Sequence, residues 1–413
     1  MDVDLAALPD DVDALHRLIR DLTAERVGER AALCEAQTEI ERLRLIVWKL
    51  QRLQFGRRAE RLDGDQLDLG LEDLGADIAR STLANWVGGA AWWLEPLRDR
   101  LAAHVFASTK LFADDTPLPV LDPGRGRTKT GRLWVYARDD QPWSGPEPPA
   151  AVYFYSPDRR AERPVAHLDR FKGTLQVDGY AGFEQLTTRG IVLAACWAHT
   201  RRKFYDVHVA TGSPIAAEAL RRIAELYAIE VTIRGCTAEE RRRVRAAQAQ
   251  PLVDALKLWL EAELHRVPPR GGLADAIRYA LVRWSALCRF FEDGRVELDT
   301  NTVERAIRPI ALGRKNHLFA GSDGGADRWA IVCSLITTAK LNNREPYAYL
   351  KDVLERMTNG HPMSRLDELL PWNWQPSAVQ PALGARNGRL REQVTGLLAR
   401  RGDLLTCRAE PIF

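Results

Sequence analysis

The sequence predicts an α/β protein in which a mixed sheet carries an all-helical insertion and an N-terminal coiled-coil helix precedes both. Three patterns indicate this fold class. Short β-type runs and helical segments alternate in the order β-β-β-α-β-α-β, which favours a mixed sheet that begins with hairpins. Residues 214–292 are helix-forming, with apolar residues three to four positions apart. Residues 12–50 carry an apolar heptad pattern.

Composition sets the broad class of protein. With 413 residues the chain suggests two to three domains, and 46% hydrophobic with 28% charged residues exclude disorder or collagen-like repeats throughout. A net charge of +3 does not by itself indicate a nucleic-acid binder. We expect no membrane span and no secretory signal. The six scattered cysteines, without any C-x-x-C pair, predict reduced thiols in a cytoplasm.

Residues 1–62 are expected to form a coiled-coil and basic leader. The heptad seam favours self-association, and the alternative is an amphipathic helix packed on its own domain. Residues 41–62 hold seven basic residues against two glutamates, so Arg57 and Arg58 are candidate DNA contacts unless the charges are merely solvated. Residues 63–80 contain an acidic stretch that reads as an exposed linker.

The folded region is expected to begin with a helical lead-in over residues 81–110, capped by Ser81 or Thr82. Expected strands cover residues 111–113, 132–138, 151–155, 174–177 and 191–196, with a helix near 164–171 and another short helix before the last strand. The predicted divisions are a first core part over 111–212, the helical insertion over 213–298, final core helices over 299–374 and a weakly specified tail over 375–413.

Acidic residues occur at three positions, two at the ends of expected apolar strands and one in an expected helix. Asp114 and Asp115 close an apolar strand, Asp178 ends the strand TLQV, and Glu304 lies one turn into a helix. A buried acid is unfavourable unless it is paired or binds a cation, and an oxygen-only set suits Mg²⁺ or Mn²⁺. The alternatives are turn-capping Asp residues and a surface Glu304 paired with Arg308.

Several runs stand in a fixed order along the chain: FADDTPLPVLDPGRGRTKTGRLWVYARDD, LQVDGYAGF, CWAHTRRKFYD, TVERAIRPIALGRKNHLFAGSDGG and LLPWNW, with FGRRAERL before them. They resemble the insertion-sequence-66 family of bacterial DDE transposases over nearly all of residues 40–374. The resemblance implies an RNase H-like core, with one Asp on the first strand, one on the fourth, and a Glu on a helix that follows a helical insertion.

The resemblance also implies the roles of individual residues. The family's Ala-Asp-Glu-Thr-Pro motif falls on residues 113–117, so Asp114 is the implied first metal ligand and Asp115 stands where the family usually has Glu. Asp178 and Glu304 complete the implied set, which would hold two Mg²⁺ or Mn²⁺ ions. Thr300 departs from the usual first Asn of the motif around Glu304, although Thr can still cap a helix.

Cys196-x-x-His199 is similar to a C-x-x-H motif of several DDE families. One Cys and one His cannot close a tetrahedral zinc site, so we expect no zinc, and a structural or DNA-facing role is favoured. The alternative for His199 is a packing role. Basic residues near the carboxylates are candidate phosphate contacts rather than generic solvated charge. The candidate DNA-binding residues are His199, Arg201, Arg202, Lys203, Arg305, Arg308, Arg314 and Lys315.

The chain departs from the family pattern by a whole segment as well as at Asp115 and Thr300. Relatives usually carry a Cys-rich zinc-finger segment between the FGRR leader and the Ser-Thr-Leu helix, and its absence here suggests an internal deletion near Arg80. We therefore predict a metal-dependent transposase that cleaves and joins DNA, acts as a homo-oligomer, works with accessory proteins of the same element and associates with the bacterial nucleoid. The alternatives are a catalytically silent regulator that binds DNA or other transposase chains and, more weakly, a phosphatase using Asp114 as nucleophile.

Overall fold

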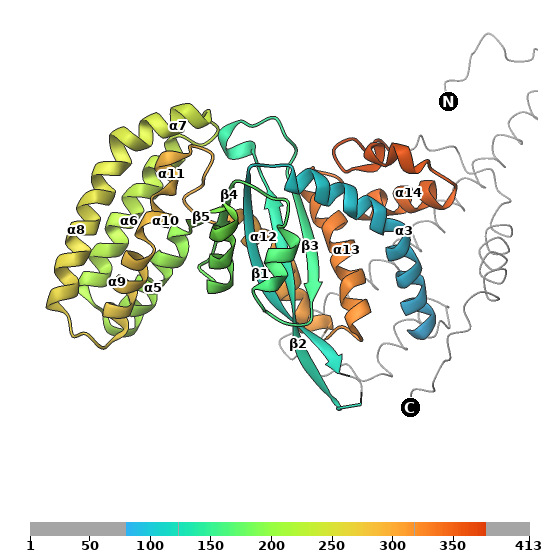
Figure 1. Cartoon of the computed structure of the whole chain (residues 1–413), viewed down its shortest axis with the longest axis horizontal. Helices are drawn as coiled ribbons and strands as arrows, with labels where there is room; N and C mark the ends of the chain where they lie inside the picture. The colour runs from blue at the N-terminus through green and yellow to red at the C-terminus, as the bar shows by residue number, and fades with distance from the viewer. Residues whose placement is uncertain (1–79, 123, 318, 377–413) are drawn as a thin grey trace, which may run out of the picture. The chain divides into compact units, whose positions relative to one another are not determined.

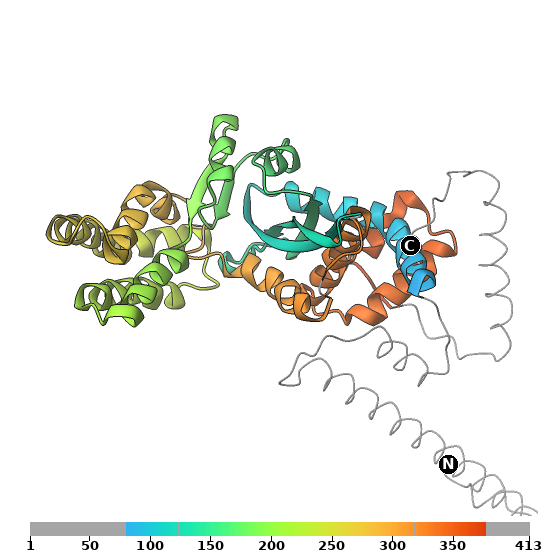
Figure 2. The ribbon, with the colours of Figure 1, turned by 90° about the horizontal axis from the view of Figure 1, so that it is seen from below.

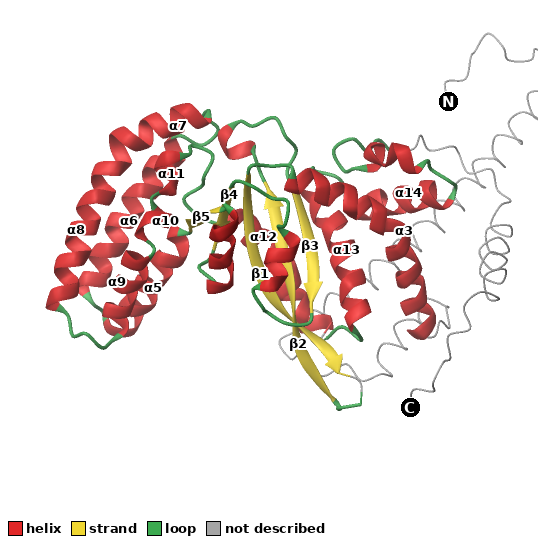
Figure 3. Ribbon diagram, viewed as in Figure 1, coloured by secondary structure: helices red, strands yellow, loops and turns green. Residues whose placement is uncertain are grey.

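The structure, a computed structural model, describes residues 80–122, 124–317 and 319–376. The predicted coiled-coil leader with Arg57 and Arg58, nearly all of the acidic linker and most of the tail lie outside the described residues. The described part has the predicted α/β character, with one mixed sheet of five strands and many helices (Figure 3). The chain divides into two compact units, residues 1–85 with 310–318, and residues 86–309 with 319–413. All contacts described below lie in the second unit.

The five strands follow the predicted order along the chain. They are β1 (Lys110–Asp122), β2 (Arg127–Arg138), β3 (Ala150–Ser156), β4 (Thr174–Val177) and β5 (Val192–Ala195). Their order across the sheet is β3-β2-β1-β4-β5. The first three strands are antiparallel neighbours, whereas β4 runs parallel to β1 and β5 runs parallel to β4 (Figure 1). The carboxyl ends of β1, β4 and β5 therefore point the same way.

Strand β1 is much longer than the three residues that the sequence indicated. It continues through Pro117 and Pro119 and pairs with β2 as far as Asp122. Proline lacks an N–H donor and is tolerated in a strand where that side of the backbone needs no partner. Strand β4 pairs with β1 only from Lys110 to Phe112. Further along the same side, the Ala320 N–H donates to the Pro119 carbonyl and the Ala320 carbonyl accepts from the Leu121 N–H, so this bridge needs no N–H from Pro119.

The helices of the described residues group into two sets. Those beside the sheet are α3 (Arg80–Phe106), α4 (Glu162–His167), α12 (Asn301–His317), α13 (Asp323–Leu341) and α14 (Pro346–Thr358), with short 3-10 helices at Gln141–Trp143, Ala181–Arg189 and Met363–Leu369. Those of the all-helical segment are α5 (Trp197–Thr211), α6 (Pro214–Thr232), α7 (Ala238–Val244), a π-helical turn at Arg245–Ala249, α8 (Gln250–Arg266), α9 (Gly272–Val282), α10 (Trp284–Leu287) and α11 (Arg289–Glu292) (Figure 2).

Two apolar cores correspond to these two sets. The first joins the sheet to α3, α13 and α14 through residues such as Leu101, Trp134 and Leu335. The second is formed by the all-helical segment and includes Phe204 of α5 and Ile277 of α9. Helix α5 thus contributes to the core of the helical segment, although it begins directly after β5. Residues at the junction of the two cores are well placed to form a site.

Edge strand β3 is closed by a helix instead of another strand. Thr338 of α13 accepts a hydrogen bond from the Ala151 N–H and donates one to the Ala151 carbonyl, and the Tyr153 N–H donates to Ser334 Oγ at 2.9 Å. An open strand edge exposes unpaired backbone groups that favour aggregation. These hydroxyl groups satisfy that edge and fix α13 against the sheet.

Candidate active site

Asp114 and Asp178 lie side by side at the carboxyl ends of neighbouring parallel strands. Phe112 of β1 pairs with Gln176 of β4, and continuing this register by two residues on both strands places Asp114 beside Asp178. Neighbouring strands are about 4.8 Å apart, and paired side chains of parallel strands point to the same face. The sheet itself therefore brings together two of the three carboxylates that the sequence singled out.

The environment of Asp114 is unfavourable for a negative charge. The pKa of Asp114 is raised to about 7, mainly by burial and next by the neighbouring charge of Asp178. The Asp115 N–H, which donates to Asp114 Oδ1 at 2.7 Å, and the nearby imidazole of His199 act in the opposite direction. Among the described residues, neither Asp114 nor Asp178 forms an ion pair. An uncompensated carboxylate pair of this kind fits a divalent cation with oxygen ligands.

Asp115 points away from this pair, because successive side chains of a strand face opposite sides of the sheet. Its carboxylate is 1% exposed and accepts hydrogen bonds from Arg132 at 3.0 Å and Arg159 at 2.7 Å. The guanidinium of Arg159 also lies 4.0 Å from the centre of the Tyr180 ring. Asp115 is thus neutralised within the protein, and its position where the resembling family usually has Glu leaves the Asp114 face unchanged.

The turn that carries Asp178 is held by the all-helical segment. The Tyr180 N–H donates to Asp178 Oδ1 at 2.9 Å, and the Tyr279 hydroxyl donates to the Asp178 carbonyl at 3.0 Å. Gly179 between them has a φ of +108°, and a Cβ there would lie 3.0 Å from Arg283 Nε. Tyr279 and Arg283 come from helix α9 and its end, far away in the sequence, and sequence reasoning missed both because no local signal marks them.

Cys196 and His199 stand at the start of α5, directly after β5. Since Val177 pairs with Ala195, the next residue on each strand places Cys196 beside Asp178 in register. Cys196 is 2% exposed, and burial raises the pKa of its thiol to about 11, so the free thiol is protonated at neutral pH. His199 Nδ1 is buried and has no hydrogen-bond partner among the described residues.

Helix α12 is anchored so that Glu304 points towards α5. The Gln176 side chain of β4 donates to the Glu297 carbonyl at 2.9 Å and accepts from the Glu297 N–H at 2.8 Å. The Trp197 N–H donates to the Leu298 carbonyl at 2.9 Å. These bonds join the segment before α12 to the ends of β4 and β5, and they fix where the helix begins.

Thr300 controls the side chain of Glu304 directly. Its carbonyl accepts from the Glu304 N–H at 3.1 Å, as the residue before a helix does, and its hydroxyl donates to Glu304 Oε1 at 3.0 Å. The same hydroxyl lies 3.3 Å from Cys196 Sγ. Thr300 therefore orients the Glu304 side chain, although the usual residue there is Asn.

The three predicted carboxylates do not converge on one ready-made metal position. Among the described residues, the group of three ligand-bearing side chains with ligand atoms within 4.8 Å of one another consists of Cys196, His199 and Glu304. His199 Nδ1 lies 3.8 Å from Glu304 Oε1. Glu304 is thus grouped with the Cys-x-x-His residues, and His199 is also near enough to Asp114 to lower its pKa.

Several of the predicted DNA-contacting residues cluster around this site. Arg201, Arg202 and Lys203 are exposed on the first turns of α5, and Arg305 and Arg308 are exposed on α12. Of these, Arg202 pairs with Asp206 at 2.9 Å, and Lys203 lies 5.5 Å from the Tyr279 ring centre. The side chains of Arg314 and Lys315 are not among those that the structure describes.

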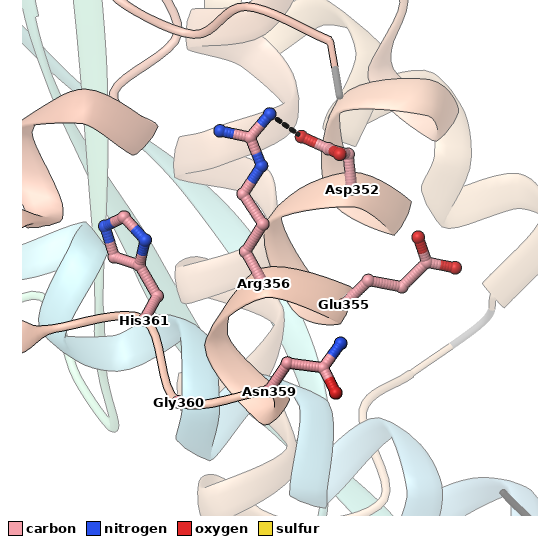
Figure 4. A pocket seen from close by; sticks show the side chains of 6 residues that line it. All are labelled: Asp352, Glu355, Arg356, Asn359, Gly360 and His361. Atoms are coloured by element: carbon pink, nitrogen blue, oxygen red, sulfur yellow. Dashed lines mark ion pairs between the residues drawn. The ribbon is translucent and has the colours of Figure 1, made fainter. Parts of the chain in front are cut away.

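Two hollows on the surface of the described residues are candidate binding sites. One of about 130 Å³ lies beside the start of α12, and its lining includes Asp299, Asn301, Arg305 and Arg241. The other, of about 400 Å³, lies at the end of α14 (Figure 4). It is lined by Asp352, Glu355, Arg356, Asn359, Gly360 and His361. There Arg356 pairs with Asp352 at 2.8 Å, so the Asp352 carboxylate is already neutralised, unlike the pair Asp114 and Asp178.

Comparison with known proteins is consistent with this placement of motifs. Residues 67–328 match the family model described as Transposase IS66 family, and residues 334–372 match the IS66 C-terminal element. In Sinorhizobium fredii (strain NBRC 101917 / NGR234), the uncharacterized proteins y4jD and y4hP are each 44% identical to this chain, over 316 and 322 residues, and y4qI is 42% identical over 314 residues.

These matches cover 74–75% of this chain but only 58–62% of each relative, so the chain spans about 60% of the length of the curated relatives it matches. No helix in the described part of the chain combines the length and apolar character needed to cross a membrane.

Proposed function

This chain belongs to the IS66 transposase family, and from that premise we propose that it is a DDE transposase. It would cleave DNA strands at the ends of an insertion sequence and transfer them to target DNA, using Mg²⁺ or Mn²⁺. The observation that carries the proposal is the pair Asp114 and Asp178, adjacent at the ends of parallel strands and without an ion-pair partner among the described residues.

The sheet topology supports an RNase H-like core. Three antiparallel strands are followed by two strands parallel to the first, in the spatial order β3-β2-β1-β4-β5. The first acid lies on β1, the second directly follows β4, and Glu304 lies on a helix that comes after the all-helical segment. This is the order that the resemblance to DDE transposases implies.

Asp114 and Asp178 would hold the cations, with Glu304 completing the set. Two bound divalent ions would activate the attacking water or 3′-hydroxyl and stabilise the leaving oxygen. Because Glu304 lies with Cys196 and His199 in this structure, its side chain has to turn towards the Asp pair to join them. Asp114 must also be ionised to act as a ligand, which its raised pKa opposes and a nearby cation favours.

The protein's other residues would bind and position the DNA. The exposed Arg201, Arg202 and Lys203 on α5 and Arg305 and Arg308 on α12 lie on the two helices whose first turns meet at the site, and suit phosphate contacts. Reaction at both ends of an element requires two coordinated sites, so we propose a homo-oligomer on DNA, assisted by accessory proteins of the element and associated with the nucleoid.

One observation favours a second candidate. Glu304 is placed away from the Asp pair, as expected for a catalytically silent chain that binds DNA or joins other transposase chains as a regulator.

A cleavage and joining assay separates the two functions. A labelled duplex carrying the ends of the element is incubated with the protein and Mg²⁺ or Mn²⁺, and the protein is compared with Asp178→Ala and Glu304→Ala. Glu184→Ala, which removes an exposed acid, is the matched control. Metal-dependent products that survive in the control and fall at least 100-fold in both other variants are expected. Absence of products with DNA binding intact would refute the enzyme and favour the regulator.

A further inference from the structure

We propose that Cys196, His199 and Glu304 form a binding site for Zn²⁺, and that zinc bound there inhibits the chain by keeping Glu304 away from Asp114 and Asp178. The binding site stands on the geometry alone. The inhibitory effect rests on the proposed transposase function, because it presumes that Glu304 takes part in the reaction.

The three side chains provide the donor atoms that zinc prefers. Zn²⁺ binds thiolate sulfur at about 2.3 Å and imidazole nitrogen or carboxylate oxygen at about 2.0–2.2 Å, usually in a tetrahedron. In such a tetrahedron, the ligand atoms are roughly 3.3–3.7 Å apart. Here all three ligand atoms lie within 4.8 Å of one another, and His199 Nδ1 is 3.8 Å from Glu304 Oε1. Movements of the ligand atoms by about 1 Å would bring them to these separations, and a water molecule would be the fourth ligand.

Two features mark the site as more than a chance cluster. His199 Nδ1 is buried without a hydrogen-bond partner among the described residues, and leaving such an atom unsatisfied is unfavourable. A metal ion would satisfy it. The Thr300 hydroxyl lies 3.3 Å from Cys196 Sγ and 3.0 Å from Glu304 Oε1, where it can hydrogen-bond to ligand atoms and orient them.

The fold brings a third possible zinc ligand to the Cys-x-x-His motif. The Cys-x-x-His motif alone offers two ligands, too few for zinc, but the fold adds Glu304 from α12 as the third. Binding would convert the Cys196 thiol to a zinc-bound thiolate and release its proton to solvent, with no change in oxidation state. Zinc would hold the Glu304 carboxylate with Cys196 and His199 and so withdraw it from the site of Asp114 and Asp178.

Co²⁺ substitution tests the site without requiring catalysis. The full chain is titrated with Co²⁺, whose bond to a thiolate gives a near-ultraviolet charge-transfer absorption, and Zn²⁺ is then added to displace it. We expect this absorption in the parent chain and its loss in Cys196→Ser. The control Cys288→Ser, which alters a half-buried thiol of the helical segment, should retain it. His199→Ala should weaken Co²⁺ binding at least 10-fold. No charge-transfer absorption in the parent, or its persistence in Cys196→Ser, would overturn the site.

The inhibitory effect has its own readout. Zinc is titrated into the Mg²⁺-dependent cleavage reaction, and each variant is compared with its own zinc-free rate. Cys196→Ser should need at least 10-fold more zinc for half inhibition than the parent and Cys288→Ser. Equal sensitivity would refute the inhibition while leaving the site. If no variant cleaves DNA, the proposed function and the inhibition fail together, and the Co²⁺ titration still decides whether the site exists.

Discussion

Replacing Asp114 with Asn should stabilise the metal-free protein at alkaline pH. The pKa of Asp114 rises from 3.8 to about 7 on folding. Each unit of difference between the folded and unfolded pKa corresponds to about 1.4 kcal/mol. The ionised carboxylate therefore lowers the stability of the folded state by about 4 kcal/mol. Because the pKa is raised in the folded state, the stability that this group contributes is present below pH 3.8 and is lost as the pH rises through about 7. Asn cannot ionise, so it avoids this loss.

Urea denaturation at several pH values, with a chelator present, measures the effect. The free energy of unfolding of Asp114→Asn should exceed that of the parent by about 4 kcal/mol at pH 8 and by less than about 1 kcal/mol at pH 4. Adding Mg²⁺ should stabilise the parent and not the variant. Asp115→Asn is the matched control, and it should destabilise the protein, because it removes the partner of Arg132 and Arg159. A gain that does not change with pH, or a loss at pH 8, would refute the reasoning.

Two further predictions concern stability away from the carboxylate pair. Gln176→Met removes both hydrogen bonds to the Glu297 backbone and should lower the free energy of unfolding by about 2–4 kcal/mol, whereas the exposed Gln185→Met should not change it in the same denaturation experiment. Burial lowers the pKa of Lys110 from 10.5 to about 8. Below pH 8 the buried amine is charged and destabilises the fold by the full amount, and this destabilisation disappears as the pH rises to 10.5. Lys110→Met should therefore gain about 1–3 kcal/mol at pH 7, a gain that disappears near pH 10.5; an equal gain at both pH values would contradict it.

The strands and their sequence order could be predicted because their signals are local. Apolar and aromatic runs bounded by Gly and Pro mark β2 and β3, and TLQV marks β4 to the residue. The extent of β1 could not be predicted in this way. Whether Pro117 and Pro119 end a strand depends on what lies on the other side of it, and that is set by where β4 ends and by the distant Ala320, which bridges to β1 there.

The same distinction applies to the candidate site. Asp114 and Asp178 each stand at a strand end that the sequence reveals, and parallel pairing of those strands brings them together. Tyr279 and Arg283 reach the Asp178 turn from a separate helix, and their contact depends on how the helical segment packs. The position of Glu304 relative to the Asp pair depends on side-chain rotation, which motif spacing does not encode.

Thr300 shows what that rotation involves. Its hydroxyl has one proton and lies near both Glu304 Oε1 and Cys196 Sγ. Since the thiol is protonated at neutral pH, it can donate to Thr300 while Thr300 donates to Glu304. Turning Glu304 towards the Asp pair breaks the second bond, a hydrogen bond to a carboxylate, at a cost of about 1.5–3 kcal/mol, which favours the present position by roughly 10- to 160-fold. A divalent cation held by Asp114 and Asp178 attracts the carboxylate more strongly than one hydroxyl group does. The residue in place of the usual Asn therefore sets a bias that metal binding can reverse.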